Sequence, residues 1–405
     1  MKFLHIADLH IGKRVNEFSM LEDQKHILNQ ILKMTDDIKP AGILIAGDVY
    51  DKSVPSGEAV EVLDDFLTEL AARQVPIFVI SGNHDSPERL DFGSRIMARH
   101  GVHIAGTFDV AFQNGVLHSV TLQDEYGPVH IFLLPFIKPA MVQPHFEENI
   151  ESYEDAARAV IQNTPVNRAE RNILVAHQFI TSGTLEPERS DSETVAVGGV
   201  DNIDASVFEP FDYVALGHLH GPQSIGRETV RYSGSPLKYS FSEVRQRKSV
   251  TLIDFAQKGT IEIQTLSLIP RRDLREIKGP LAELLRAGAA PLDSGDTVGA
   301  ANSAPDLNGS ICQDYIRAIL TDEEELFDAI GQLRQVYPNI MRIDFENTRS
   351  RQAADSPTAA SGDVARKSPL ELFDEFYLKQ NNGEMNEEQH RIIEAIMEQA
   401  GGGKR

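Results

Sequence analysis

Short apolar runs alternate with longer mixed stretches over the first 270 residues of the chain. Most of the runs are almost continuously apolar, which is typical of strands covered on both faces. The runs that predict strands are MKFLHIA (1–7), AGILIAG (41–47), PIFVISG (76–82), VHIFLLP (129–135), NILVAHQ (172–178) and DYVALGH (212–218). Residues 21–38 and 56–73 carry apolar side chains at every third or fourth position and predict helices. This alternation predicts an α/β fold of layered sheets flanked by helices.

The pattern changes after residue 248. Residues 249–268 read as two strands around Lys258-Gly259 and predict a β-hairpin. A small α+β domain is predicted over 271–348, with a helix at 281–287, a strand at 314–320, a helix at 323–336 that has Leu326, Ile330 and Leu333 on one face, and a strand over NIMRIDFE (339–346). Residues 287–310 are rich in Gly, Ala, Ser and Asp, which predicts a mobile insertion. A large first region therefore precedes a smaller second one.

The last part of the chain has two further patterns. Residues 349–368 have the composition of a linker. Residues 369–400 predict two short amphipathic helices around Asn-Asn-Gly, one with an apolar stripe that includes Phe373 and one with a stripe that includes Ile396. Two helices of this size do not bury both stripes by themselves. They either fold back on the core or clasp an apolar surface of another chain.

Composition narrows the class of protein. The 405 residues are 41% hydrophobic, which is enough for globular cores in two or three domains. The single cysteine, Cys312, excludes a disulfide framework and a CxxC zinc site. No signal peptide is recognisable, and no apolar stretch reaches the ~18 residues that a membrane span needs. We expect a cytoplasmic protein.

The net charge of −22 affects the choice of substrate. It opposes unaided, non-specific binding to a polyanion. A nucleic-acid substrate would therefore require local basic groups, metal ions or a partner protein. Small basic clusters lie at Lys13 and Arg14 and at Arg245, Arg247 and Lys248. Each can be a phosphate contact or simply a solvated charge, and we favour Lys13 and Arg14 as contacts to a DNA backbone.

Polar side chains of one kind follow five of the predicted strands. They are Asp8 and His10; Asp48 and Asp51; Asn83 and His84, followed by Asp85; His177; and His218 and His220. In open α/β sheets, ligands gather outside the carboxyl ends of strands. We therefore expect these groups to converge on one rim.

Imidazole, carboxylate and amide ligands together suit divalent metals such as Mn²⁺, Fe²⁺ or Zn²⁺. Two such ions in one site activate water and support in-line displacement at phosphorus. Each motif alone also has a purely structural interpretation: Asp48 could be a helix N-cap, and GNHD could be an Asx-type turn. The five motifs in series favour the metal site.

The motifs DxH (8–10), GDxxD (47–51), GNHD (82–85), the isolated His177 and GHxH (217–220), in this order, resemble the calcineurin-type metallophosphoesterase superfamily over roughly residues 1–235. Longer segments, LHIADLHIGK, LIAGDVYDKSVPS, VISGNHDSPERL and YSGSPLKYSFSE, are similar to the SbcD family, which supplies the nuclease component of bacterial SbcCD complexes. This closer resemblance extends through the hairpin and the α+β region, which corresponds to the SbcD capping domain. It weakens over 287–310 and 349–405.

The resemblance implies a role for each site residue. One metal ion would be held by Asp8, His10 and His220, the other by Asn83, His177 and His218, and Asp48 would bridge them. His84 would face the phosphate, stabilise developing charge and protonate the leaving oxygen, with Asp51 holding it in orientation.

The resemblance also implies an activity and partners. It implies Mn²⁺-dependent cleavage of DNA, with Mg²⁺ or Fe²⁺ as substitutes: 3′→5′ exonuclease action on duplex ends and endonuclease action on single strands and hairpins. The implied partners are an SMC-like ATPase of the SbcC type, docked by the terminal helices, and a second copy of the chain. The sequence has no GxxxxGK[ST] motif, so ATP dependence would come from the partner.

Two other functions remain open on the sequence. The metal site could act on a small nucleotide or phosphomonoester, since a fold does not fix the substrate. The chain could also be a scaffold that recruits a partner through its terminal helices. The 135 residues after the hairpin argue against the first alternative, and the complete set of ligand-type residues argues against the second.

Overall fold

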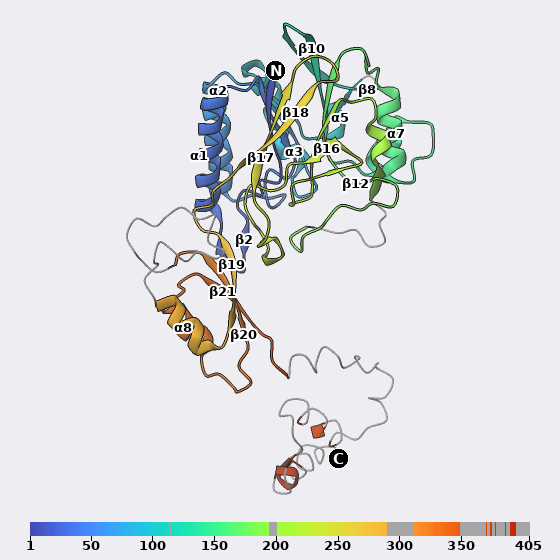
Figure 1. The fold of residues 1–405 in the computed structure, drawn as a ribbon. Helices are drawn as coiled ribbons and strands as arrows, with labels where there is room; N and C mark the ends of the chain where they lie inside the picture. Colours follow the sequence, from blue (N-terminus) through green and yellow to red (C-terminus); the bar gives the residue numbers. More distant parts are fainter. Residues whose placement is uncertain are drawn as a thin grey trace. The chain divides into compact units, whose positions relative to one another are not determined.

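The computed structural model describes residues 1–113, 115–193, 201–289 and 312–348, with 370, 373, 374, 377, 385 and 389–393 (Figure 1). The chain divides into two compact units. Among the described residues, the first unit takes in Met1–Glu276, residues 312–317 and Tyr337–Arg342, and the second takes in Ile277–Ala289, Ala318–Val336 and the described residues from 343 onward. The predicted domain boundaries at 270, 348 and 368 stay predictions.

A six-stranded sheet in the order β18-β17-β1-β4-β5-β6 forms one layer of the first unit. Its strands are β1 (Lys2–Ile6), β4 (Gly42–Ala46), β5 (Ile77–Ile80), β6 (Val102–Ala105), β17 (Ser249–Phe255) and β18 (Ile261–Ser267). Strands β1, β4, β5 and β6 run parallel to one another. Strand β17 is antiparallel to both β1 and β18, which confirms the predicted hairpin.

A second six-stranded sheet has the order β15-β16-β14-β11-β10-β9. Its strands are β9 (Ser119–Asp124), β10 (Gly127–Leu134), β11 (Arg171–His177), β14 (Tyr213–Gly217), β15 (Gln223–Ile225) and β16 (Arg227–Tyr232). The four central strands are parallel, and the edge strands β9 and β15 are antiparallel to their neighbours. All six predicted strands are present, in mixed sheets flanked by helices, so the predicted fold class is confirmed.

Strand β1 shows why the apolar runs are nearly continuous. Phe3 and Ala7 belong to a core that also contains the inner residues of the second sheet, whereas Leu4 and Ile6 belong to a core under helices α1 (Leu21–Ile38) and α2 (Gly57–Ala72). Alternate side chains of a strand point to opposite faces, so both faces of β1 are buried. Figure 1 shows α1 and α2 side by side along one face of the unit, and α7 (Tyr153–Asn163) beside the other sheet.

Short elements occupy the connections of the first unit. They are β2 (Arg14–Val15), β3 (Phe18–Ser19), α3 (Pro87–Leu90), α4 (Ser94–Met97), α5 (Phe108–Ala111), β7 (Phe112–Gln113), β8 (Val116–Leu117), α6 (Pro139–Val142), β12 (Phe179–Thr181) and β13 (Asn202–Asp204). Most of them follow a strand of one of the large sheets, where the predicted site residues also lie. Among the described residues, the helices are all too short or too polar to cross a bilayer.

Strands β19 (Leu274–Gly279), β20 (Tyr315–Leu320) and β21 (Ile340–Phe345) form a three-stranded sheet in that order. The predicted helix at 281–287 is α8, which continues to Ala289 and so enters the predicted insertion. The rest of that insertion lies outside the described residues.

The predicted helix over 323–336 is wrong in its first half, because α9 spans only Ala329–Arg334. The side chain of Asp328 caps α9 by accepting from the backbone of Gly331. Glu323 bonds the backbone of Thr348 instead of extending the helix. The predicted stripe is also wrong in part, since Leu333 is buried but Ile330 is exposed.

Of the described residues in the predicted C-terminal helix pair, 370, 373, 374, 377 and 389–393 are helical and 385 is not. His390 Nε2 lies 3.3 Å from Asp374 Oδ2, which links the two segments. The remainder of the pair and the predicted linker over 349–368 lie outside the described residues.

Candidate metal centre

The predicted site residues lie at the carboxyl ends of strands from both large sheets. Asp8 and His10 follow β1, Asp48 and Asp51 follow β4, Asn83 and His84 follow β5, His177 ends β11, and His218 and His220 follow β14. Because the parallel strands of each sheet end at the same edge, and the sheets share a core, these side chains meet. The predicted convergence on one rim is what the structure contains.

Four of these residues have a backbone conformation that L-residues rarely adopt. Asp8, His10, Asp48 and His218 have φ values of 53°, 44°, 47° and 101°. Such conformations cost about 1–3 kcal/mol each and persist where surrounding structure fixes them. Here His10 N donates to the Asp48 carbonyl at 2.9 Å, and His218 N donates to Asp8 Oδ1 at 2.9 Å. These hydrogen bonds hold the unusual backbone conformations, which direct the side chains toward one another.

Glycines in the motifs make room for the site. A Cβ on Gly82 would lie 2.1 Å from Asp48 Oδ1, and a Cβ on Gly47, which has a φ of +84°, would lie 2.3 Å from His177 Nδ1. Real Cβ atoms do not approach other atoms this closely. The glycines of GNHD and GDxxD are therefore required by the close packing of the ligand-type side chains, as well as by the turn at Gly47.

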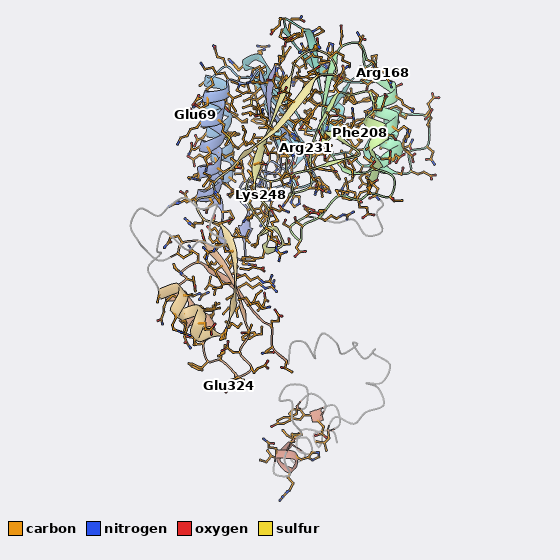
Figure 2. The ribbon with its side chains drawn as sticks, viewed as in Figure 1. Glu69, Arg168, Phe208, Arg231, Lys248 and Glu324 are labelled. Carbon is orange, nitrogen blue, oxygen red and sulfur yellow. The ribbon has the colours of Figure 1, made fainter. Side chains whose placement is uncertain are left out.

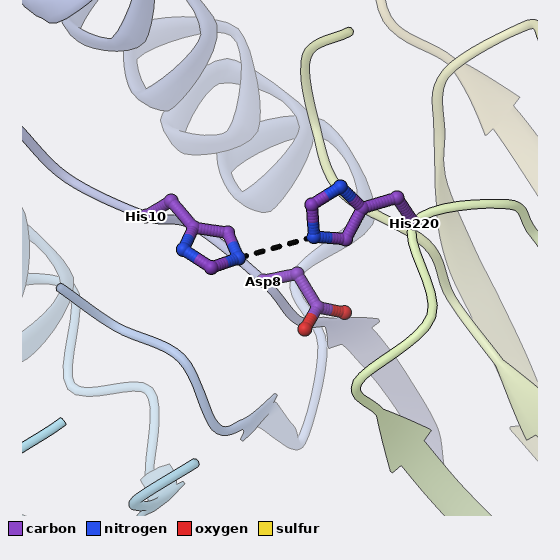
Figure 3. Close-up of side chains that lie close together, drawn as sticks. All are labelled: Asp8, His10 and His220. Carbon is purple, nitrogen blue, oxygen red and sulfur yellow. Dashed lines mark hydrogen bonds between the residues drawn. The ribbon is translucent and has the colours of Figure 1, made fainter. Parts of the chain in front are cut away.

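One group of ligand-type side chains comprises Asp8, His10 and His220. Figure 3 shows the His10 and His220 rings facing each other with Asp8 close beside them, and one ligand atom from each residue lies within 4.8 Å of the others. The Nε2 atoms of His10 and His220 are 3.1 Å apart. Asp8 Oδ2 is buried and has no hydrogen-bond partner among the described residues. Burying an unpaired carboxylate oxygen is costly, so this group fits a cation site.

A second group comprises Asn83, His177 and His218. Asn83 Oδ1 lies 3.0 Å from His177 Nε2 and 3.0 Å from His218 Nδ1. Asp48 lies between the two groups, because its Oδ2 is 3.5 Å from His177 Nε2 and 3.6 Å from His10 Nε2. A shared carboxylate flanked by imidazoles is the arrangement that two neighbouring cations require.

The hydrogen bonds of His177 also fit a metal ligand. Its Nδ1–H donates to the Ala46 carbonyl at 2.8 Å, which leaves Nε2 facing Asn83 and Asp48. Metal-ligating imidazoles usually donate from their second ring nitrogen in this way. Burial lowers the pKa of His177, but the Asp48 and Asp8 carboxylates and the Ala46 carbonyl together raise that pKa to about 9. The surroundings of Nε2 therefore favour positive charge.

His84 is held through the main-chain carbonyl of Asp51. Its Nδ1 donates to the main-chain carbonyl of Asp51 at 3.0 Å, and its Nε2 lies 4.0 Å from Asp48 Oδ2. The Asp51 carboxylate instead pairs with Lys13 Nζ at 2.7 Å. Lys13, expected to contact DNA, is thus held inside the site, and Arg14 bonds the nearby Glu17 carbonyl. DNA contact by Lys13 and Arg14 stays a prediction.

Asp85, the last residue of GNHD, has a structural role that the sequence did not reveal. Its buried carboxylate accepts hydrogen bonds from the backbone N–H groups of Val49 at 3.0 Å, Tyr50 at 2.8 Å and Gly82 at 2.9 Å. It therefore ties the loop after β4 to the loop after β5. A carboxylate that caps its own turn gives the same sequence signal, so no pattern distinguishes the two roles.

A buried ion pair behind His220 was also missed. The Lys248 ammonium lies 2.6 Å from Glu243 Oε2, and both side chains are buried, so Lys248 is no solvated charge. Figure 2 labels Lys248 among the side chains of the first unit. His220 Nδ1 donates to Ser192 Oγ at 2.7 Å, and Ser192 Oγ donates to Glu243 Oε1 at 2.5 Å. This relay leaves His220 Nε2 facing His10. Glu243 is the last residue of the segment SPLKYSFSE. In the sequence, only the family resemblance singled this segment out.

Two family models match the chain. One, described as calcineurin-like phosphoesterase, covers residues 1–222, and one, described as type 5 capsule protein repressor C-terminal domain, covers 270–381. The SbcD component of the nuclease SbcCD from Staphylococcus epidermidis is 34% identical over 348 residues, which are 85% of this chain and 85% of that protein. The chain belongs to the SbcD family. The resemblance stated from the motifs is confirmed.

Solved structures also overlap with the chain in part. TT1561 of Thermus thermophilus is 13% identical with a TM-score of 0.38, and the overlap covers 65% of this chain and 98% of TT1561. A dimetal phosphatase from Danio rerio is 12% identical with a TM-score of 0.39, and the overlap covers 66% of this chain and 96% of the phosphatase. Family membership alone makes the chain a metal-dependent phosphoester hydrolase.

Proposed function

We propose that the chain is a Mn²⁺-dependent DNA nuclease that works with an SMC-like ATPase of the SbcC type. The observation that carries this proposal is the convergence of seven ligand-type side chains on two adjoining groups that share Asp48. The family relationship to a nuclease supports DNA as the substrate. The expected actions are 3′→5′ cleavage of duplex ends and cleavage of single strands and hairpins, in break processing, replication and recombination.

The proposed ligand sets follow the two groups. Asp8, His10 and His220 would hold one divalent cation. Asn83, His177 and His218 would hold the other, with Asp48 bridging the pair. Bound divalent cations supply an activated water and neutralise charge on the phosphate. Imidazole with carboxylate and amide oxygens suits Mn²⁺, and Mg²⁺ or Fe²⁺ are the expected substitutes.

His84 is the proposed proton donor. Its side chain is 23% exposed, whereas His10 and His177 are fully buried, so His84 is the imidazole that a substrate can reach. The Asp51 carbonyl fixes Nδ1, which turns Nε2 toward the metal centre. From there His84 stabilises charge on the transferred phosphoryl group and protonates the leaving oxygen.

The partner proposals rest on other parts of the chain. Docking on the ATPase is assigned to the helix pair predicted over 369–400. Self-association is supported by large apolar side chains that follow GNHD: Phe92, in the turn between α3 and α4, is 86% exposed, and Ile96, in α4, is 70% exposed. Exposure of this kind is typical of a protein–protein surface. Phe92→Asp should shift the sedimentation of the purified chain from dimer to monomer. Action on DNA places the protein at the cytoplasmic nucleoid.

The proposed function is tested with an end-labelled DNA hairpin and Mn²⁺. Wild type and His84→Gln are compared, with and without the ATPase partner, and the metal content of both is measured. We expect wild type to cut, and His84→Gln to keep its metals but to lose roughly a hundredfold or more of its rate. If neither cuts the hairpin while wild type hydrolyses a small phosphodiester, the substrate is a small molecule and the DNA proposal fails.

A further inference from the structure

Two cations beside the metal centre, Lys138 and Arg189, make no ion pair with the described residues. Each lies above an aromatic ring. The other nearby lysines are already paired, Lys13 with Asp51 and Lys248 with a buried glutamate. In a chain of net charge −22, unpaired cations next to the site are the ones available to an anionic substrate.

Lys138 is held over Phe136, which borders the second ligand group. The Phe136 ring centroid lies 6.2 Å from that of His177 and 6.5 Å from that of His218, and it is nearly parallel to His218 at 18°. Lys138 Nζ lies 5.9 Å from the same ring. Phe136 is only half-buried and Lys138 is exposed, so both can contact a molecule bound at the centre.

The loop that carries these two residues is well fixed. It reads PFIKP, with a proline on each side, and proline restricts the backbone to one φ value. Phe136 N donates to the Ser81 carbonyl at 3.0 Å, and Gln178 Nε2 donates to the Ile137 carbonyl at 3.4 Å. The aromatic ring and the ammonium are thus presented on a rigid support rather than on a loose loop.

Arg189 is likewise held over an aromatic ring that lies near His218. Its guanidinium carbon lies 3.9 Å from the ring centroid of Phe179, which is buried, and that ring is 6.3 Å from His218. The guanidinium is therefore no more than about 10 Å from His218. The backbone before Arg189 is fixed by Gln223, which accepts from Glu188 N at 2.9 Å and donates to its carbonyl at 2.8 Å.

We propose that Phe136, Lys138 and Arg189 form a nucleotide-binding rim that selects a single-stranded substrate. Phe136 stacks on an unpaired base, and the two cations contact phosphates beside the scissile bond. A paired base has both faces covered by its neighbours, so the stacking contact favours single strands and frayed ends. This inference rests on the proposed function, because it specifies the substrate at that same site.

The test uses the full chain with Mn²⁺ and three substrates: a labelled dT oligonucleotide, the same oligonucleotide with abasic residues around the cleavage position, and methyl p-nitrophenyl phosphate. The last has no base and no flanking phosphate, so it reports on the metal centre alone. Phe136→Leu should lower kcat/KM about tenfold on the dT oligonucleotide. It should have little effect on the abasic one, and Phe136→Tyr should restore the loss.

The contribution of the two cations is measured separately, through the dependence of kcat/KM on salt concentration. Lys138→Ala and Arg189→Gln should each lower kcat/KM on both oligonucleotides and reduce its slope against the logarithm of salt concentration by about 0.7. Lys33→Ala, which removes an exposed lysine from α1, is the matched control and should leave both unchanged. All variants should keep wild-type activity on the small diester and wild-type metal content.

Three results would overturn the inference. The first is an unchanged kcat/KM and salt slope in Phe136→Leu, Lys138→Ala and Arg189→Gln. The second is an equal loss on all three substrates, which would assign these residues to the support of the metal centre. The third is a wild-type protein that cleaves the small diester but neither oligonucleotide, in which case the proposed function fails and the nucleotide-binding rim fails with it.

Discussion

Replacing Glu243 by Gln should destabilise the protein by about 3 kcal/mol. The substitution keeps the shape of the side chain but leaves the Lys248 ammonium, 4% exposed, without its counter-charge. Removing one partner of a buried pair costs about 3–5 kcal/mol. The lower end applies because Lys248 retains three acceptors, namely the His220 carbonyl at 2.8 Å, Ser235 Oγ at 2.9 Å and Gln246 Oε1 at 2.8 Å.

The same substitution should weaken Mn²⁺ binding about tenfold or more, because the groups behind a ligating imidazole usually contribute that much. Glu243 Oε1 ends the relay that runs from His220 Nδ1 through Ser192. A glutamine can present its NH₂ group to the serine hydroxyl, which reverses the relay and removes the fixed tautomer of His220. Stability and metal affinity are thus expected to fall together.

The assay is urea unfolding of Glu243→Gln, Lys248→Met and the double variant, with Mn²⁺ titrations of each folded protein. The double variant should be more stable than the sum of the single losses implies, since it leaves no unpaired buried charge. Glu209→Gln breaks an ion pair with both partners 64% exposed and should change stability little. A loss below 1 kcal/mol for Glu243→Gln, or strictly additive losses, would refute this reasoning.

Two further predictions address the loops and the core. Gly82→Ala should abolish cleavage and metal binding, because the new Cβ would lie 2.1 Å from Asp48 Oδ1. Gly57→Ala is the control, since there is open space around Gly57. It should keep activity and gain up to about 1 kcal/mol of stability in urea unfolding. Full activity in Gly82→Ala would contradict the packing. Burial lowers the pKa of His5 to about 3. Below pH 6.5 the His5 imidazole is therefore protonated in the unfolded chain but stays neutral in the folded chain, so the free energy of unfolding falls. Between pH 6.5 and 5, wild type should lose about 2 kcal/mol more than His5→Gln in urea unfolding; equal pH profiles would contradict this.

The strand ends were predictable because the apolar runs are covered on both faces and the ligand-type residues follow them directly. Asp8, Asp48 and His177 could be assigned to one rim on that basis alone. What the pattern does not contain is the pairing of β1 with β17, or the packing of one sheet on the other. Periodicity identifies a strand but carries no information about its neighbour.

The errors share a physical cause, which is that a polar side chain's partner is decided by tertiary packing. The Lys248 and Glu243 side chains look like surface charges in the sequence, yet each is buried because the other is present. The Asp51 carboxylate pairs with Lys13, a partner that the sequence did not indicate, while the Asp51 main-chain carbonyl contacts His84. The predicted helix before Asp328 failed for the same reason, since Glu323 bonds the backbone of Thr348.

The two ligand groups join residues that are far apart in the sequence. His10 meets His220 across 210 residues, and β1 receives its antiparallel neighbour only from Ser249–Phe255. Contacts of this range form late, because the intervening chain must first be ordered. On the ribosome, a growing chain therefore has no complete ligand set until residue 220 has been made and the second sheet has docked. Chains that stop earlier carry the DxH, GDxxD and GNHD motifs but cannot be nucleases.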